Sequence, residues 1–208
     1  PNRADTADAR ANGVPWPQLF APLAAALYDP ALEDAMAASA RPDVISFATG
    51  QPAPECYPIP VVRHLLDEAL HREGPRLLQY CPTEGYPPLR EAIAAWSRAA
   101  GIHCTPDQVL VVSGSQQGLY LIARALLEPG DLVAVEAPTY VGALQIFRAL
   151  GARLLPIPTD ESGMRVSVLE QALQHRRPKL IYTLPTFQNP SGITLSLDRR
   201  RRLLEVAA

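Results

Sequence analysis

The stretch "LVAVEAPTYVGALQIFRALGARLLPIPTD", residues 132–160, alternates between two kinds of pattern. Residues 132–140 and 152–160 are short apolar runs, while residues 141–151 between them have the apolar spacing of a helix. Two short strands joined by a helix of this length form a right-handed βαβ unit with parallel strands. The stretch therefore predicts an α/β fold.

The same alternation extends in both directions from this stretch. An apolar run at 109–114 is followed by a helical pattern at 115–130, and further elements follow at 165–176, 179–185 and 195–208. This repetition predicts a mainly parallel sheet with helices on both faces. Upstream, the patterns predict an N-terminal arm over about residues 1–20, a short strand and Gly/Pro-rich loop within 43–58, and helices at 30–39, 59–74 and 87–101.

The composition excludes several classes of protein. Hydrophobic residues make up 48% of the chain, charged residues 19%, and the net charge is −2, which does not favour a nucleic-acid or membrane-surface partner. The sequence contains neither an apolar run of the ~20 residues that span a bilayer nor a secretory signal at its start. Cys56, Cys81 and Cys104 have no metal-type spacing, so we expect a reduced, cytoplasmic chain without a metal site.

Unusual residues follow three of the predicted strands. "SGSQQG" at 113–118 joins a strand to a helix: Gly114 permits a tight turn, Ser113 or Ser115 can cap the helix, and the free amides can bind phosphate. The alternative is an ordinary helix N-terminus without a ligand. Tyr140 and Asn189, which taken alone are more typical of edge packing and of a turn, follow two other strands. Together the three indicate a phosphorylated, planar ligand beyond the carboxyl ends of the strands.

Five motifs carry a resemblance to a known family: "ISFATGQPAPECYP", "LQYCPTEGYPPLREAIAAW", "VLVVSGSQQGL", "GDLVAVEAPTYVGALQIF" and "PKLIYTLPTFQNPSG". In order and spacing, over about residues 40–195, the chain resembles the class I/II aminotransferases of pyridoxal 5'-phosphate (PLP) fold type I. The 2-aminoadipate and kynurenine aminotransferases are the nearest branch. The resemblance implies 1–55 as an N-terminal arm with a small-domain segment, and 56–208 as the first part of the PLP-binding large domain.

The resemblance also implies roles for individual residues. Ser115 and Gln116 would hold the PLP phosphate, and Tyr140 would stack on the pyridine ring. Asn189 would hydrogen-bond the phenolic oxygen of the ring and help to bind the substrate carboxylate. Gly50 would let the substrate approach the backbone closely, although a plain turn glycine is an equal alternative. Tyr80 would reach the phosphate and substrate of the neighbouring subunit, which implies a homodimer with shared active sites.

PLP chemistry needs a lysine that forms a Schiff base with the cofactor. Lys179 is the only lysine, and it opens the run 179–185, whereas Asn189 follows the far end of that run. Five or six residues of strand separate the two by roughly 16–20 Å, so Lys179 cannot be this lysine. In the family, the lysine, the aspartate that pairs with the pyridine nitrogen and the arginine that grips the substrate come after the point corresponding to residue 208. We therefore expect no catalytic residue here, half an active site, and no transamination by residues 1–208 alone.

The resemblance implies an enzyme that moves an amino group from an amino acid to a 2-oxo acid. Aminoadipate-like, aromatic and branched-chain substrates remain open. One alternative is the effector-binding domain of a MocR-type transcription regulator, although residues 1–40 are too few for its winged helix-turn-helix. Two further candidates are a truncated, non-catalytic pseudo-enzyme and a different reaction of the same fold, such as β-elimination or decarboxylation.

Overall fold

A computed structural model describes residues 14–21, 24, 30–39, 41, 43–46, 50 and 52–208. Most of the predicted N-terminal arm, residues 1–13, lies outside the described residues, as do residues 47–49 of the predicted short strand. Residues 43–46 of that strand adopt turn and irregular structure instead. The described chain forms two compact units: one contains residues 113–208 together with the described residues before residue 30, and the other contains residues 30–112. The division of the chain at residue 55 stays a prediction.

The unit of residues 113–208 is built on a four-stranded sheet with the order β3-β2-β1-β4. Its strands are β1 (Leu132–Ala137), β2 (Arg153–Asp160), β3 (Gly163–Met164) and β4 (Leu180–Tyr182). Central β1 pairs in parallel with both β2 and β4, and β3 pairs antiparallel with β2. The mainly parallel sheet is confirmed, although the two residues of β3 are too few for a pattern to predict.

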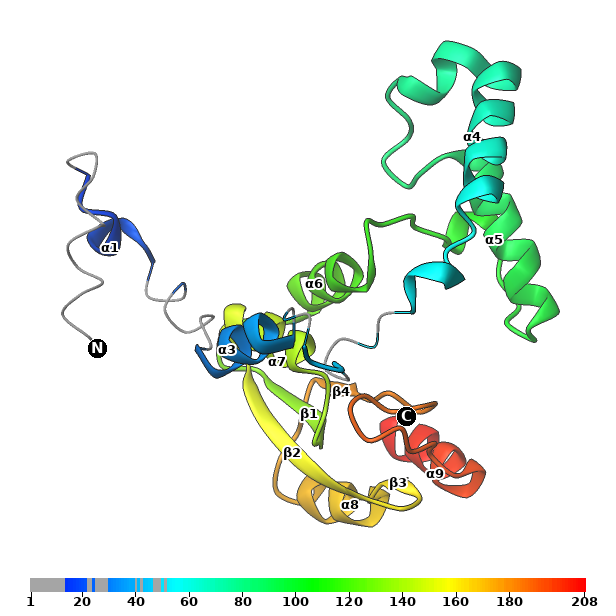
Figure 1. The fold of residues 1–208 in the computed structure, drawn as a ribbon. Coiled ribbons are helices and arrows are strands. Elements are labelled where there is room, and N and C mark those ends of the chain that lie inside the picture. The colour runs from blue at the N-terminus through cyan, green and yellow to red at the C-terminus, as the bar shows by residue number, and fades with distance from the viewer. Residues whose placement is uncertain are drawn as a thin grey trace. The chain divides into compact units, whose positions relative to one another are not determined.

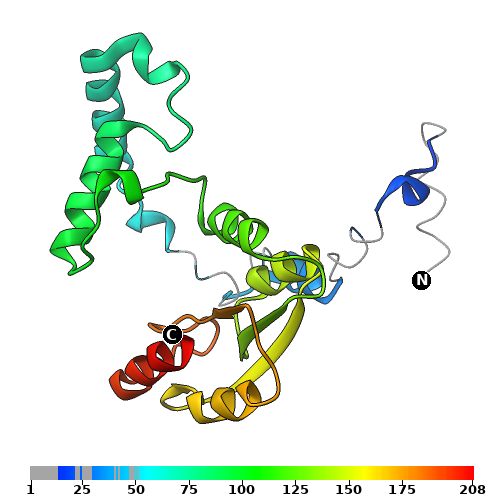
Figure 2. The same ribbon diagram turned by 180° about the vertical axis from the view of Figure 1, so that it is seen from behind.

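Helices cover both faces of this sheet. They are α6 (Ser115–Leu126), α7 (Val141–Ala149), α8 (Val166–Leu173) and α9 (Leu197–Ala207). Figures 1 and 2 show α6 and α7 on one side of the strands and α8 and α9 on the other. Because side chains alternate along a strand, Val133 and Val135 pack with α6 and α7, whereas Ala134 packs with α8 and α9. The predicted three-layer arrangement is confirmed.

The connections reverse direction at β1. From β1 the chain passes through α7 to β2 on one side, then through α8 to β4 on the other side of β1. In open parallel sheets, ligands bind beyond the carboxyl ends of the strands at such a reversal. The loops that follow β1 and β4 therefore occupy the expected ligand position.

The prediction of a strand over 109–114 is wrong. These residues form neither a strand nor a bridge, because no described strand pairs with them. Their backbone groups find other partners within the unit of residues 30–112. The Val111 amide donates to the Glu84 carbonyl at 2.9 Å, and Arg90 Nε donates to the Val109 carbonyl at 3.0 Å.

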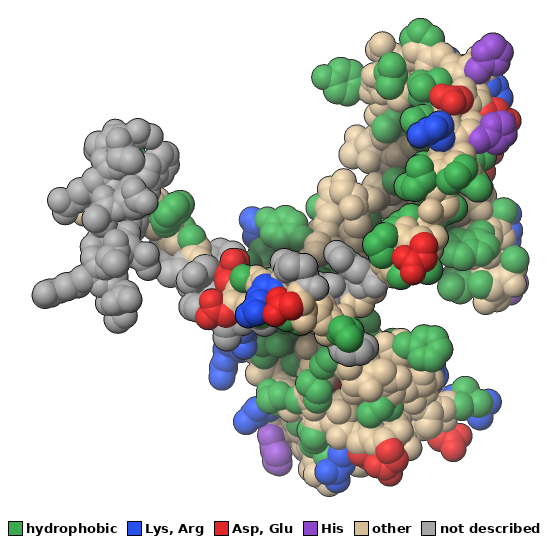
Figure 3. Space-filling model, in the orientation of Figure 1, with side chains coloured by type: hydrophobic (Ala, Val, Ile, Leu, Met, Phe, Trp, Pro, Cys, Tyr) green, Lys and Arg blue, Asp and Glu red, His purple; other side chains and the backbone are tan. Residues whose placement is uncertain are grey.

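The unit of residues 30–112 is helical, as the periodicity predicts. Its elements are α3 (Pro30–Ser39), α4 (Ile59–Glu73), α5 (Pro87–Ala99), and the 3₁₀ turns η2 (Pro54–Cys56), η3 (Gly74–Leu78) and η4 (Pro106–Gln108), while α1 (Trp16–Leu19) precedes them in the chain. The apolar side chains Val62, Leu65 and Leu66, which give α4 its helical spacing of apolar residues, are exposed. Figure 3 shows hydrophobic side chains gathered over α4 and α5.

None of the helices in the described part of the chain has the length and apolar character needed to cross a bilayer. The described residues contain no group of three or more His, Cys, Asp or Glu side chains that could hold a metal ion. The three cysteines are free thiols, with Cys56 and Cys81 exposed.

A bidentate ion pair ties α9 to the end of β2. Arg199 Nη1 and Nη2 donate to the two carboxylate oxygens of Asp160 at 2.6 and 2.8 Å. This guanidinium, aided by the Ser162 amide, lowers the pKa of Asp160 from 3.8 to about 2. Because the folded-state pKa is the lower one, the pair stabilises the fold fully above pH 3.8, and this contribution disappears as the pH falls towards 2.

We therefore expect Asp160→Asn to lower the thermal unfolding midpoint of the protein by a constant amount above about pH 4.5, and by less at each lower pH. Unfolding of the protein and the variant, followed by circular dichroism from pH 6 to pH 3, measures this difference. The exposed Asp67, for which the described structure shows no ion pair, provides the matched Asp67→Asn control. A difference that does not shrink with acidification contradicts the assignment.

Candidate functional site

The N-termini of α6 and α7 meet through a hydrogen bond between two predicted site residues. Gln116 Nε2 donates to the Tyr140 hydroxyl at 2.9 Å. The two side chains fill the space beside Gly142, where an added Cβ would lie 2.1 Å from Gln116 Nε2 and 2.7 Å from the Tyr140 hydroxyl. A side chain at position 142 would therefore displace both residues. The sequence pattern contains this glycine, but its steric role becomes visible only in the structure.

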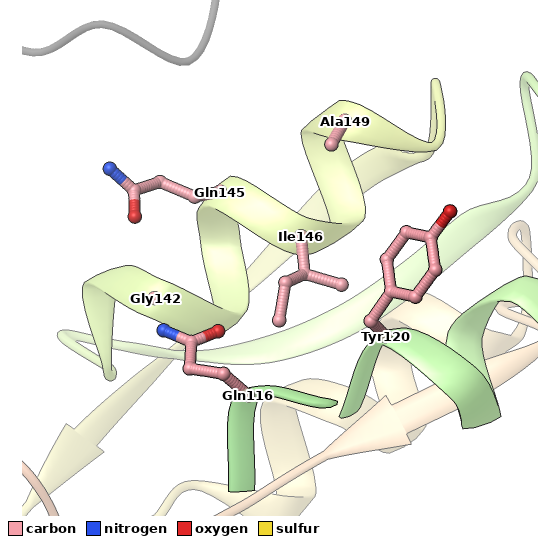
Figure 4. Close-up of a pocket in the computed structure, with 6 residues that line it drawn as sticks. All are labelled: Gln116, Tyr120, Gly142, Gln145, Ile146 and Ala149. Atoms are coloured by element: carbon pink, nitrogen blue, oxygen red, sulfur yellow. The ribbon is translucent and has the colours of Figure 1, made fainter. Parts of the chain in front are cut away.

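A pocket of about 330 Å³ opens between α6 and α7 beside this contact. In Figure 4, Gln116 at the start of α6 extends toward Gly142 at the start of α7, and Ile146 and Tyr120 project between the helices. The pocket is lined by Gln116, Tyr120, Gly142, Gln145, Ile146 and Ala149. Tyr140 and Asn189 are not among the lining residues, so this pocket is not the predicted ligand position.

The N-terminus of α6 has the character of an anion site. The N-cap residue is Gly114 with φ of 145°, and none of the described side chains caps the helix, so the prediction that Ser113 or Ser115 does so is wrong. The Gln117 side chain instead accepts the amide of Ser113 at 2.6 Å. The amides of Ser115, Gln116 and Gln117 precede the first intrahelical bond and point out of the helix end, where the helix dipole favours an anion.

Asn189 lies in an exposed turn after β4, at the same edge of the sheet as Tyr140 after β1. The neighbouring Gln188 is 2% exposed, and its Nε2 donates to the Pro138 carbonyl at 2.7 Å. Since Pro138 lies two residues before Tyr140, this bond joins the Asn189 turn directly to the Tyr140 loop. The structure therefore brings Gln116, Tyr140 and the Asn189 turn together.

Sequence reasoning missed Glu136, the buried polar side chain beneath this edge. Glu136 is 2% exposed and accepts hydrogen bonds from the Thr183 hydroxyl at 2.7 Å, the Leu184 amide at 3.1 Å and Gln188 Nε2 at 3.3 Å. The Leu184 bond occupies an amide that the predicted strand 179–185 would have used for pairing, and β4 ends at Tyr182. The sequence contains a signal for this residue: Glu136 lies in an apolar run that predicts a strand covered on both faces, and a charged side chain in such a strand is buried.

Two further groups lie around Tyr140. The Thr139 hydroxyl oxygen is buried and is without a hydrogen-bond partner among the described residues. Burial raises the pKa of the Tyr182 phenol. The Tyr182 ring packs edge-on against Phe147, with ring centroids 5.6 Å apart. Tyr182 and Tyr140 pack against the same hydrophobic cluster, which contains Phe147.

The structure places Lys179 at the other edge of the sheet. Its amide donates to the Leu132 carbonyl at the start of β1, and its Nζ lies 3.1 Å from Asp131 Oδ2. Leu132 begins β1, and Lys179 directly precedes β4. Tyr140 follows the far end of β1, and Asn189 follows the far end of β4. Lys179 therefore forms an ion pair with Asp131 at the edge of the sheet opposite to Tyr140 and Asn189.

The remaining predicted site residues lie in the unit of residues 30–112. Gly50 has φ of 59°, a left-handed conformation that favours glycine, and open space surrounds the position of an added Cβ. Tyr80 is fully exposed within the described structure. The ligand roles of both residues stay predictions.

The residues at the carboxyl edge of β1 and β4 fit a phosphorylated, planar group. The outward amides at α6 match a phosphate, the Tyr140 ring offers a flat face, and the Asn189 amide offers a hydrogen bond. The space beside Tyr140 is crowded, since an added Cβ at Gly142 would lie 2.7 Å from the Tyr140 hydroxyl. PLP has the required phosphate, ring and phenolic oxygen.

Comparisons with known proteins agree with this geometry. Residues 42–208 match the family model for aminotransferase class I and II. The chain is 44% identical over 172 residues to the aromatic-amino-acid aminotransferase 1 of Thermococcus litoralis, covering 80% of this chain and 41% of that protein. The crystal structure of LysN, the α-aminoadipate aminotransferase of Thermus thermophilus complexed with N-(5'-phosphopyridoxyl)-L-leucine, superposes with a TM-score of 0.81 at 37% identity, covering 93% of this chain and 47% of that one.

A regulatory protein is also similar in sequence to this chain. The probable rhizopine catabolism regulatory protein MocR of Rhizobium meliloti is 35% identical over 166 residues, covering 79% of this chain and 33% of that protein. The chain thus spans about half the length, or less, of the relatives it matches.

Proposed function

The chain belongs to the class I and II aminotransferase family, with PLP fold type I, and from this membership we propose that the whole protein is a PLP-dependent aminotransferase. It would move an amino group from an amino acid to a 2-oxo acid. The observation that carries the proposal is the meeting of Gln116, Tyr140 and the Asn189 turn at one edge of the sheet. The two enzymes compared above support aminoadipate-like, aromatic or branched-chain substrates.

The residues of this chain bind and orient the cofactor. PLP, the cofactor of the family, supplies an electron sink for the charge left when the Cα proton of the amino acid departs. Ser115 and Gln116 bind the phosphate through the N-terminus of α6, and the Tyr140 ring stacks on the pyridine ring. The Asn189 amide donates a hydrogen bond to the phenolic oxygen, which favours its ionised form, and helps to bind the substrate carboxylate.

We also propose that the protein is a cytoplasmic homodimer. Tyr80 would contact the phosphate and substrate of the neighbouring subunit, and Gly50 would let the substrate approach the backbone. The full exposure of Tyr80 and the exposed apolar face of α4 leave both available to a second copy of the chain. The sharing of sites remains a prediction for the whole protein.

The lysine that reacts with PLP lies, in this proposal, outside residues 1–208, because Lys179 is the only lysine and is engaged by Asp131 at the wrong edge. We expect PLP and borohydride to add one reduced cofactor per subunit of the natural full-length protein. Peptide mapping by mass spectrometry should locate the adduct on a lysine beyond residue 208. The variant Lys179→Arg should be labelled to the same extent.

Labelling at Lys179, or a natural protein that ends at Ala208 and still turns over, contradicts the proposal. Labelling without turnover of aminoadipate, aromatic or branched-chain amino acids points instead to a different fold-type-I reaction or a pseudo-enzyme. The match to MocR favours one further candidate, an effector-binding domain of a regulator. Sequence-specific DNA binding by the natural protein, without transamination, supports that candidate.

A further inference from the structure

We propose that Gln188 and Glu136 are positioning residues that set the place of Asn189 relative to Tyr140. This inference rests on the proposed function, in which Asn189 and Tyr140 contact the cofactor. Neither Gln188 nor Glu136 needs to touch PLP. Both act through the loops that carry the contacting side chains.

The buried side-chain amide of Gln188 joins two loops, at Pro138 and at Ser191. Its Nε2 donates to the Pro138 carbonyl at 2.7 Å, and its Oε1 accepts from the Ser191 amide at 2.9 Å and the Ser191 hydroxyl at 2.6 Å. The Ser191 bonds close the turn around Asn189, while the Pro138 bond ties that turn to the loop before Tyr140. A side chain with an acceptor on one branch and a donor on the other is required for both connections.

Glu136 fixes the orientation of Gln188 from below. Its carboxylate accepts from Gln188 Nε2 at 3.3 Å, which keeps the amide nitrogen toward Pro138 and the amide oxygen toward Ser191. The same carboxylate holds the Thr183 hydroxyl at 2.7 Å and the Leu184 amide at 3.1 Å, so the chain leaving β4 is anchored before it reaches Asn189. Because Glu136 and Gln188 are each 2% exposed, water does not compete for these bonds.

The anchoring is needed because the residues beyond β4 lack sheet pairing. β4 ends at Tyr182, and the segment that follows forms turns and irregular structure up to α9. Asn189 itself is exposed. Within the turn, the Gln188 backbone amide also donates to the Ile193 carbonyl at 2.8 Å, whereas the link from the turn to the Tyr140 loop is the bond from Gln188 Nε2 to Pro138.

The test replaces Gln188 with methionine, which keeps the length of the side chain, adds no charge, and removes both the donor to Pro138 and Glu136 and the acceptor for Ser191. The readout is the pH midpoint of the visible absorbance of PLP bound to the full-length protein, measured with the PLP dissociation constant of the apoprotein. Gln188→Met should raise the midpoint by about one pH unit and weaken PLP binding about tenfold, since the phenolic oxygen loses a well-placed donor. The matched control Gln171→Met makes the same change at an exposed position of α8 and should change neither value.

Asn189→Ala separates this inference from the proposed function. If Asn189→Ala and Gln188→Met both raise the midpoint, the positioning role is supported. If only Asn189→Ala does so, Gln188 has no positioning role; if Asn189→Ala has no effect, the proposed cofactor contact itself fails. Should Gln188→Met not fold, Gln188→Leu serves in its place, because it also lacks the donor to Pro138 and the acceptor for Ser191. It should raise the midpoint as well, and an unchanged midpoint overturns the inference.

Discussion

Replacing Gly142 with alanine is expected to weaken PLP binding by the full-length protein about tenfold, although alanine is the better helix former by ~1 kcal/mol. The added Cβ would lie 2.1 Å from Gln116 Nε2 and 2.7 Å from the Tyr140 hydroxyl, so both side chains must move. Overpacking of this kind costs about 1–3 kcal/mol, and 1.4 kcal/mol corresponds to a factor of ten in affinity. Titration of the apoprotein with PLP, followed by absorbance or tyrosine fluorescence, measures the change.

Two further variants separate the possible causes of a loss of PLP affinity in Gly142→Ala. Tyr140→Phe removes the hydroxyl and its bond to Gln116 but leaves the ring in place, so its effect on PLP affinity should be the smaller one. In Gly142→Ala combined with Gln116→Ala, the nearest obstructing atom is absent, so the two losses should not add. Gly142→Ala with unchanged PLP affinity and a raised unfolding temperature would show helix propensity alone, and would contradict the steric role.

Much of the fold follows from patterns that one element carries alone. The alternation within 132–160 predicts β1, α7 and β2, because a buried strand and an amphipathic helix have different apolar periods. Pairing between distant segments is not encoded in this way. The run 109–114 has the composition of a strand, but a strand also needs a neighbour, and in the described structure Glu84 and Arg90 satisfy its backbone instead.

The candidate site also contains residues that sequence patterns predict and contacts that only the fold reveals. Gln116, Tyr140 and Asn189 could be predicted because they follow apolar runs, and the carboxyl ends of parallel strands share one edge. The cap of α6 could not, because Ser113, Gly114 and Ser115 are all good N-terminal residues and only the backbone conformation selects Gly114. Glu136 and Pro138, two of the partners of Gln188, lie about fifty residues away in the chain, and only the completed fold brings them together.

Replacing Glu136 with alanine is expected to lower the free energy of unfolding by about 3–5 kcal/mol, the largest stability effect among these variants. The substitution leaves the Thr183 hydroxyl and the Leu184 amide without their acceptor and removes one of the two acceptors of Gln188 Nε2. A buried donor without a partner costs about 1–3 kcal/mol, and the vacated volume adds a cavity term. Denaturant unfolding of the full-length protein at fixed concentration measures the loss.

Glu136→Gln and Glu128→Ala identify the origin of that loss. The amide oxygen of Glu136→Gln can still accept from Leu184 and Gln188, and the Thr183 hydroxyl can accept from the new amide nitrogen, so we expect a loss of about 1 kcal/mol or less. Glu128 is exposed, and its replacement by alanine should change stability by less than about 0.5 kcal/mol. If Glu136→Ala resembles Glu128→Ala, the carboxylate does not organise the loops after β1 and β4. A large loss for alanine with a small one for glutamine shows that hydrogen-bond acceptance, rather than charge, holds this edge of the sheet together.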